Sequence, residues 1–390
     1  MRLVYLDGMR GLFALSVVVY HLFFLFLPAA VTGNPEAMHL SGPWERILAG
    51  LPQFLYNGNC SVCVFFVLSG FVLSCRFWEK RETSLLTSAA LRRYLRLTFP
   101  ALASILLAYL LMKAGWMRTQ EFFPVAQSID VVGVVYRHAA DFPAACWEGL
   151  WGMYFSYDMG LSYNPVLWTM EIELKGSFLS FAFLSVFGGE RRRWVIYLVL
   201  ALILWKTYYL SFVLGVALSD MACSSEGRFL WQTLGRRRLL TWGILGPGIL
   251  LSSYVADGRH GVFRWMNAPV FEAMQVNSEA FYHILGAFFL VYVVLQEPVL
   301  QELFRKKIFT VPGRYSFAIY LVHVPVFCSL GGTVFLHFLH LGWSYGVSAG
   351  CAAAASLPVI ALLAWGMHHF VEKPANGLAK RFERGFMASS

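Results

Sequence analysis

Long apolar runs, separated by short polar segments, recur along the whole chain. A transmembrane α-helix needs about 20 consecutive, predominantly apolar residues. Ten segments approach this length: 9–30, 54–75, 97–114, 166–187, 194–206, 207–222, 239–256, 280–300, 314–336 and 346–370. The pattern therefore predicts an all-α fold, a polytopic transmembrane helical bundle of about ten spans. Residues 205–207 are the predicted turn between the two shortest spans.

The distribution of Lys and Arg supports this number of spans. Short cytosolic loops carry an excess of basic residues. Ten spans, with both termini cytosolic, place the main basic blocks on the cytosolic side: 76–96, 191–193, 228–238, 305–314 and 373–384. Joining the two shortest spans would give nine and would move the blocks 228–238 and 373–384 to the other side. Ten spans therefore fit better.

Composition leads to the same class of protein. Residues of the AVILMFWYC set make up 58% of the chain and charged residues only 14%. A soluble protein this apolar would lack polar surface, whereas a lipid bilayer accepts apolar side chains. The net charge of +9 then reflects topology and attraction to anionic headgroups or phosphate-bearing cofactors, and no nucleic acid is expected. Cys60 and Cys63 lack a second ligand pair, so no metal is expected, and most of the cysteines, which lie in or beside apolar runs, are interpreted as small hydrophobes.

One connecting segment, 115–165, is long and rich in aromatic residues and proline. Ten spans place it on the outer side of the membrane. Its composition predicts an ordered lid or lateral cap. Because no internal repeat is found, we interpret 1–390 as a single domain with this external loop.

The first span contains two residues that are costly in a membrane. A charged side chain at the bilayer centre costs roughly 2.5–3.5 kcal/mol, so such residues usually face the interior of the bundle. Arg10 and His21 are eleven residues apart, which places them on one face of a helix and about 16 Å apart along its axis. A neutral, buried imidazole suits a general base. The alternative is a core histidine bonded to a neighbouring helix, with Arg10 setting topology.

Two later spans contain further polar residues. Glu173 lies near the start of the fourth span, beside Glu171 and Lys175, which can pair with each other. In the ninth span, His323 is followed by Pro325, which frees a backbone carbonyl one turn earlier and lets a cavity open. The alternatives are a salt-bridged helix start and a purely structural kink.

Arg93 and Arg96 immediately precede the third span. The unpaired N–H groups at a helix start form an anion site, so this basic cluster is a candidate phosphate site. The alternative is that the arginines only set topology. We interpret His283, His368 and His369 as packing or interfacial residues.

Taken in order, these motifs resemble the transmembrane acyltransferase 3 family. The matching elements are Leu6-Asp7-Gly8-Met9-Arg10-Gly11 with His21, the run FFVLSGF at 65–71, Arg93-x-x-Arg96, Trp168-Thr169-Met170 with Glu173, and Gly313-x-x-Ser316 through Tyr320-x-x-His323-x-Pro325. The sequence departs from the family at Cys60 and Cys63. It also departs at Lys175-Gly176-Ser177, in a form similar to fungal members, some of which act in secondary metabolism.

The resemblance implies a membrane-embedded O-acyltransferase. It would move an acyl group from acyl-CoA, with acetyl-CoA the expected donor, to a hydroxyl of a small-molecule, natural-product or sugar acceptor. His21 would act as general base, Glu173 would orient it or bond the acceptor, and His323 would donate to the developing oxyanion. For a fungal member the implied location is an ER-like endomembrane.

The donor site implied by the resemblance is basic. Arg93 and Arg96 would receive the CoA phosphates from the cytosol, and Arg10 would hold the pantetheine or phosphate end, or orient the tunnel below His21. A secondary transporter of a small organic solute would also have ten spans and buried polar residues. A membrane-bound O-acyltransferase of another fold would lack the Arg-x10-His start. The acceptor, the acyl length, a covalent intermediate and the oligomeric state stay open.

Overall fold

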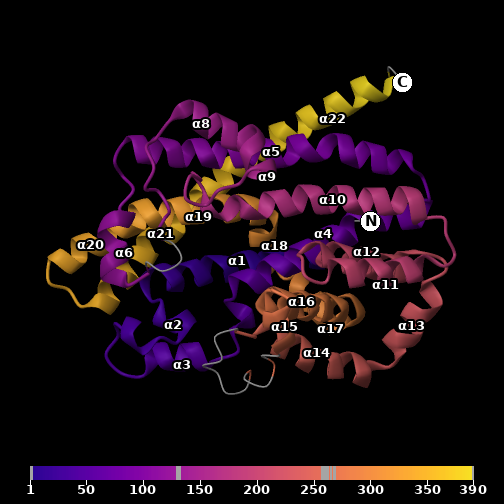
Figure 1. Cartoon of the computed structure of the whole chain (residues 1–390), viewed down its shortest axis with the longest axis horizontal. Helices are drawn as coiled ribbons and strands as arrows, with labels where there is room; N and C mark the ends of the chain where they lie inside the picture. Colours follow the sequence, from indigo (N-terminus) through magenta and orange to yellow (C-terminus); the bar gives the residue numbers. More distant parts are fainter. Residues whose placement is uncertain (1–2, 129–132, 256–262, 264–265, 267–268, 389–390) are drawn as a thin grey trace. The chain divides into compact units, whose positions relative to one another are not determined.

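The computed structural model describes residues 3–128, 133–255, 263, 266 and 269–388, and these residues form helices and connecting loops without a strand (Figure 1). They fall into two compact units, each built from three stretches of chain. Unit 1 comprises Met1–Ser16, Pro52–Leu91 and Ile172–Arg314. Unit 2 comprises Val17–Leu51, Arg92–Glu171 and Tyr315–Ser390.

Three long helices pass from one unit to the other. They are α1 (Val4–Phe26), α5 (Ser84–Lys113) and α10 (Trp168–Phe187). The remaining helices of unit 1 are η2 (Gln53–Leu55), α4 (Gly58–Lys80), α11 (Arg193–Leu204), α12 (Tyr209–Cys223), α13 (Arg228–Arg236), α14 (Arg238–Ser252), α15 (Pro269–Ala273), α16 (Ser278–Gln296), α17 (Pro298–Arg305) and α18 (Lys307–Arg314).

The described residues of unit 2 include three segments of π-helix, which are η3 (Glu148–Gly152), η6 (Phe327–Gly331) and η7 (His368–Glu372). Its other helices are α2 (Ala29–Thr32), η1 (Pro35–Ala37), α3 (Trp44–Gly50), α6 (Thr119–Ala126), α8 (Phe142–Trp147), α9 (Met153–Phe155), η4 (Pro165–Leu167), α19 (Ser316–Val326), α20 (Gly332–His340), α21 (Tyr345–Met367) and α22 (Lys373–Ala388). Isolated π-turns within helices often occur at functional sites.

Among the residues that the structure describes, six helical segments are long and apolar enough to cross a membrane: Val4–Phe26, Gly58–Lys80, Ser84–Lys113, Ser278–Gln296, Ser316–His340 and Tyr345–Met387. Three shorter apolar helices, α11, α12 and α14, add to them. The all-α class and the integral membrane character are therefore confirmed. The number of ten spans and the cytosolic termini stay predictions. The expected break at 205–207 falls between the separate helices α11 and α12 (Figure 1).

In unit 1, glycines bring α4 and α12 into backbone contact. A Cβ added at Gly70 would lie 2.5 Å from the carbonyl oxygen of Phe212. One added at Gly215 would lie 2.2 Å from the carbonyl oxygen of Val67. In a membrane, small residues allow helices to approach closely and gain van der Waals contact. Gly70, part of the FFVLSGF motif, therefore has a packing role.

Gly8 of the N-terminal motif and Gly313 of the late motif also bring backbones into contact. A Cβ at Gly8 would lie 1.8 Å from the carbonyl oxygen of Phe304 on α17, and one at Gly313 would lie 1.8 Å from that of Asp7. The start of α1 therefore packs directly on α17 and α18. Two sequence motifs from opposite ends of the chain meet here, and close backbone approach explains why both contain glycine.

A disulfide joins Cys75 on α4 to Cys223 on α12, with the two Cα atoms 5.7 Å apart. The interpretation of most cysteines as small hydrophobes without a disulfide does not hold for this pair. Cys60 and Cys63 are buried free thiols, as that interpretation expects. The arrangement of ten spans does place Cys75 and Cys223 at the same side of the membrane, but their pairing depends on the packing of α4 against α12.

Replacing Gly215 with alanine tests the close contact of α4 and α12. The added methyl group has to displace the backbone of α4, so we expect the variant to lose about 1–3 kcal/mol of stability. Gly243→Ala is the matched control, because no atom lies within 4 Å of a Cβ at that position on α14. The stability of both variants is measured by thermal unfolding in detergent, which is monitored as the loss of the monodisperse species. Equal midpoints for the two variants would contradict the packing role.

Candidate active site

Two histidines from distant parts of the sequence meet in unit 2. Nε2 of His323, on α19, lies 3.1 Å from Nδ1 of His21, on α1. The ring centroids are 4.8 Å apart, with the ring planes at 61°. His323 is fully buried and His21 is partly buried. The structure thus places the two predicted catalytic histidines in direct contact.

The backbone neighbours of this pair indicate where the protons lie. Nδ1 of His323 is 3.1 Å from the carbonyl oxygen of Ile319, and a carbonyl only accepts, so this nitrogen carries a proton. In a neutral ring, Nε2 of His323 then accepts the hydrogen bond from Nδ1–H of His21. The carbonyl oxygen of Val17 lies 3.0 Å from the same nitrogen and also accepts, so the two acceptors share this single Nδ1–H. His21 is therefore protonated on Nδ1, and its Nε2 holds the free lone pair of a base.

Pro325 shapes the helix that carries His323. Proline has no N–H, so the carbonyl of Leu321, one turn earlier, loses its helical partner. Nδ2 of Asn164 takes that place and donates to the Leu321 oxygen at 2.8 Å. The freed carbonyl expected from the sequence is confirmed. The π-helix η6 follows directly, at Phe327–Gly331.

Asn164 is a residue that sequence reasoning missed. Its side chain is fully buried, and Nδ2 also donates to Oγ of Ser104 on α5 at 3.1 Å. It therefore ties α5 to α19 two residues before His323. The only local signal is the dipeptide Asn164-Pro165, which is typical of a turn rather than of a site.

The Trp168-Thr169-Met170 motif contacts the same helix. The hydroxyl of Tyr320 donates to the carbonyl oxygen of Val166 at 2.8 Å and lies 3.0 Å from Oγ1 of Thr169. The Tyr320 and His323 rings are 5.9 Å apart. Two motifs that are far apart in sequence thus join beside the histidine pair.

The predicted phosphate-binding arginines lie on α5. Arg93 is almost fully buried, at 8% exposure, whereas Arg96 is exposed. Their neighbour Arg92 forms an ion pair with Glu383 at 3.2 Å. Because α5 begins at Ser84, both arginines lie well inside the helix. The expectation that helix-terminal N–H groups assist them is therefore wrong, so a phosphate contact at these residues would involve their guanidinium groups.

Arg10 and Glu173 belong to unit 1. Arg10 pairs with Asp7 one turn earlier, at 3.4 Å. Glu173 accepts a hydrogen bond from Oγ of Ser69 at 2.7 Å, which links the W-T-M-x-I-E element to the FFVLSGF motif. His21, His323, Arg93 and Arg96 belong to unit 2. The role of Glu173 towards His21 and the donor role of Arg10 stay predictions.

A further buried histidine has all its hydrogen bonds satisfied. Nε2 of His283 donates to the carbonyl oxygen of Tyr254 at 2.9 Å, and its Nδ1 accepts from Nδ2 of Asn59 at 2.9 Å. The hydroxyl of Tyr208 donates to Oδ1 of Asn59 at 2.7 Å. No nitrogen of His283 is left to take a proton, so the packing interpretation of this residue agrees with its contacts.

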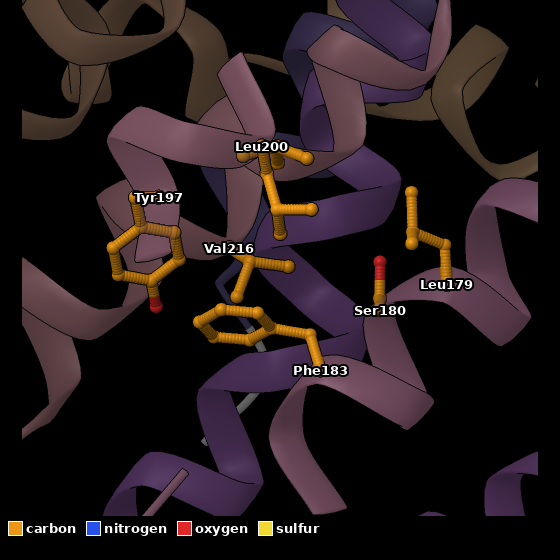
Figure 2. Close-up of a pocket in the computed structure, with 7 residues that line it drawn as sticks. Leu179, Ser180, Phe183, Tyr197, Leu200 and Val216 are labelled. Carbon is orange, nitrogen blue, oxygen red and sulfur yellow. The ribbon is translucent and has the colours of Figure 1, made fainter. Parts of the chain in front are cut away.

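Two other features of unit 1 offer little for catalysis. Among the residues described, Cys75, Glu79 and Cys223 are a group whose ligand atoms lie within 4.8 Å of one another, but the disulfide already uses both sulfurs. A small pocket lies between α10, α11 and α12. The centre of a water molecule can move within about 10 Å³ of it, so it has room for about one water. Its apolar lining, shown in Figure 2, contains none of the predicted site residues.

Comparison with known proteins decides the family. The acyltransferase domain of the acyltransferase 3 type matches residues 3–365. The chain belongs to the acyltransferase 3 family. The match includes every predicted site residue, so the protein is an acyltransferase, and the transporter interpretation is set aside.

Three fungal relatives of this acyltransferase cover most of its length. Acyltransferase R4 of Phoma sp. is 25% identical over 97% of this chain and 95% of its own. Acyltransferase clz18 of Cochliobolus lunatus is 24% identical over 95% and 94%. O-acetyltransferase PaAT-1 of Phomopsis amygdali is 26% identical over 86% and 74%. No solved structure matches the chain.

Asn164→Ala tests the hydrogen bond that supports the kink in this acyltransferase. It leaves the buried Leu321 carbonyl without a donor, so we expect a loss of about 1–3 kcal/mol in stability. Pro325→Ala restores an N–H that can bond that carbonyl within the helix. The cost of Asn164→Ala should therefore be smaller in a Pro325→Ala background, as measured by a double-mutant cycle on thermal unfolding. Equal costs in both backgrounds would show that Asn164 acts elsewhere.

Proposed function

We propose that this acyltransferase moves an acyl group, in particular acetyl, from acyl-CoA to a hydroxyl of a small-molecule acceptor, with His21 as the general base. The observation that carries this proposal is the His21–His323 pair. Its hydrogen bonds leave the lone pair on Nε2 of His21. A neutral imidazole with one free nitrogen suits proton abstraction from an alcohol.

The transfer proceeds in proton-balanced steps. Nε2 of His21 takes the proton of the acceptor hydroxyl as its oxygen attacks the thioester carbonyl. The C–S bond breaks, and the departing CoA thiolate receives the proton back from the His21 imidazolium. Direct transfer of this kind needs no acyl-enzyme, and the only proton carrier is the histidine that starts the reaction.

In this mechanism His323 is a positioning residue. Its single N–H points to the carbonyl of Ile319, so the neutral ring has no proton to give to an oxyanion. Its Nε2 instead accepts from Nδ1–H of His21, which holds that ring in one tautomer and stabilises the imidazolium as it forms. This role replaces the oxyanion donation expected from the sequence. Glu173 remains a candidate for contact with the acceptor.

In this proposal the acyl-CoA donor lies along α5. Asn164 connects Ser104 on α5 with Leu321, which lies two residues before His323. Arg96 is eight residues from Ser104 towards the start of α5, and Arg93 is eleven, or about 12 and 16 Å along the axis. Guanidinium groups suit phosphate oxygens. The CoA phosphates would lie at these arginines, and the extended pantetheine arm of CoA would bring the thioester to the histidines.

The acceptor is proposed more broadly. One of the three relatives is named an O-acetyltransferase, which supports acetyl transfer to oxygen. The three relatives come from fungi, and for a fungal enzyme of this family we propose an acceptor from secondary metabolism and an ER-like endomembrane location. A hydroxyl-bearing natural product or sugar fits the chemistry, and no metal is required.

Substitution of the histidines tests their two roles. His21→Ala should reduce CoA release by purified enzyme to the background rate, because no base remains. His323→Ala should lower kcat by roughly 10²-fold with little change in KM, because it removes only stabilisation of the imidazolium. His323→Gln should recover part of that loss, since its amide oxygen can accept from Nδ1–H.

The control for this series is His283→Asn, a change at the buried histidine of unit 1. It should leave kcat per folded molecule near the wild-type value. Folding of each variant is checked by size exclusion. Wild-type kcat in folded His21→Ala would rule out the general-base role, and a fully active His323→Ala would rule out the positioning role.

The arginine site predicts a specific interaction with phosphate. Arg93→Ala and Arg96→Ala should raise KM for acetyl-CoA, with Arg191→Ala, an exposed residue outside the site, as control. Acetyl-CoA without its 3′-phosphate separates a direct contact from a loss of fold. If an arginine binds this phosphate, removal of the phosphate should raise the KM of the wild type but leave the KM of the variant without that arginine unchanged. If both variants discriminate as well as wild type, the 3′-phosphate binds elsewhere.

A further inference from the structure

The segment Phe142–Phe155 runs beside α5 in the opposite direction (Figure 1). Three contacts fix its path: Phe142 with Tyr109 (ring centroids 5.7 Å apart), Gly149 with Leu102 (a Cβ on the glycine would lie 2.5 Å from Cδ1), and Tyr154 with Thr98 (3.0 Å between hydroxyl oxygens). The residue separations along the two helices agree. From the first contact to the second there are seven residues in each helix, and from the second to the third there are five in the segment and four in α5. The segment is therefore a helix packed antiparallel against α5.

This contact covers the middle of a candidate membrane span. The apolar part of α5 lies between Arg96 and Lys113, and Leu102 is near its centre. From Tyr109 to Thr98 is eleven residues, or about 16 Å, roughly half the thickness of the hydrocarbon core. If α5 crosses the bilayer, Gly149 lies close to the midplane.

The surface of this segment fits hydrocarbon better than water. Every exposed residue in it is apolar: Phe142, Pro143, Ala144, Trp147, Leu150, Trp151 and Phe155. Trp147, Trp151 and Phe155 form a continuous aromatic stripe, with ring centroids 6.4 and 4.2 Å apart along it. A contiguous exposed apolar surface of this kind marks a site of contact with a partner or a membrane.

The single charged residue of the segment points the other way. Glu148 is partly buried, and its carboxylate accepts from Oγ of Ser162 and, at 2.9 Å, from the backbone N–H of Tyr163. Tyr157 donates to the carbonyl of Pro165 at 2.8 Å. Two backbone groups of the non-helical return path, the N–H of Tyr163 and the carbonyl of Pro165, are thus hydrogen-bonded to the protein, as backbone at membrane depth requires. Ser156 and Asp158, where this path begins, are exposed.

We propose that residues 142–167 are a re-entrant element that enters the bilayer from the outer side, descends along α5 and returns to the start of α10. Its stripe of Trp147, Trp151 and Phe155 contacts lipid acyl chains. This element replaces part of the external loop expected at 115–165. It also leaves the parity of the ten spans unchanged, because the chain enters and leaves on one side.

Accessibility to a charged reagent tests this placement. Trp147→Cys and Trp151→Cys are compared with Trp116→Cys in proteoliposomes of phosphatidylcholine, on a Cys146→Ser, Cys351→Ser background. Trp116 is 62% exposed and Trp147 is 60% exposed, so the two differ in location and not in exposure. A sulfonated maleimide is added to both faces of the membrane. We expect Trp147→Cys and Trp151→Cys to react roughly tenfold or more slowly than the control, because charged groups do not enter hydrocarbon.

Denaturation in SDS confirms that each thiol is intact, since all three variants should then react fully. Labelling of Trp147→Cys and Trp151→Cys at the rate of Trp116→Cys in folded protein would overturn the proposal. The unsubstituted protein provides a second test. Phospholipid with a diazirine in the middle of its acyl chain should form adducts on peptides from 142–155. Adducts on α1 and α21 without any on 142–155 would also overturn the proposal.

Discussion

The carbonyl oxygen of Leu321 needs a hydrogen-bond donor, because Pro325 has removed the helical one and no bulk water is present inside a bilayer. Asn164 supplies it, and the same amide donates to Ser104 on α5. One buried side chain therefore holds α19, α5 and the segment before α10 together. His323 lies two residues from this junction, and its position against His21 depends on it.

Much of the helical architecture follows from the sequence, because crossing a bilayer requires about 20 apolar residues. The break between α11 and α12 could also be predicted, since Trp205-Lys206-Thr207 interrupts an apolar run. The start of α5 at Ser84 could not, because residues 84–92 mix apolar and polar side chains and are too short to give a membrane signal of their own. The segment Phe142–Phe155 is too short for a span and contains Glu148 and Pro143, so its packing along α5 was equally hidden.

The candidate site divides in the same way. His21 and His323 stood out because buried histidines are costly in a membrane, and the structure pairs them. Their separate roles could not be predicted, because they depend on which backbone carbonyl each ring faces. Asn164 is uncharged and 157 residues from Leu321, so only the folded chain reveals it. The Cys75–Cys223 disulfide likewise depends on how α4 packs on α12.

The central claim is acyl transfer from acyl-CoA that depends on His21. Radiolabelled acetyl-CoA, supplied to membranes containing wild type or His21→Ala with a pooled fungal lipid and metabolite extract, tests it most directly. We expect label in an organic-soluble product with wild type only, and chromatography of that product then identifies the acceptor. Equal labelling by folded His21→Ala would rule out His21 as the general base.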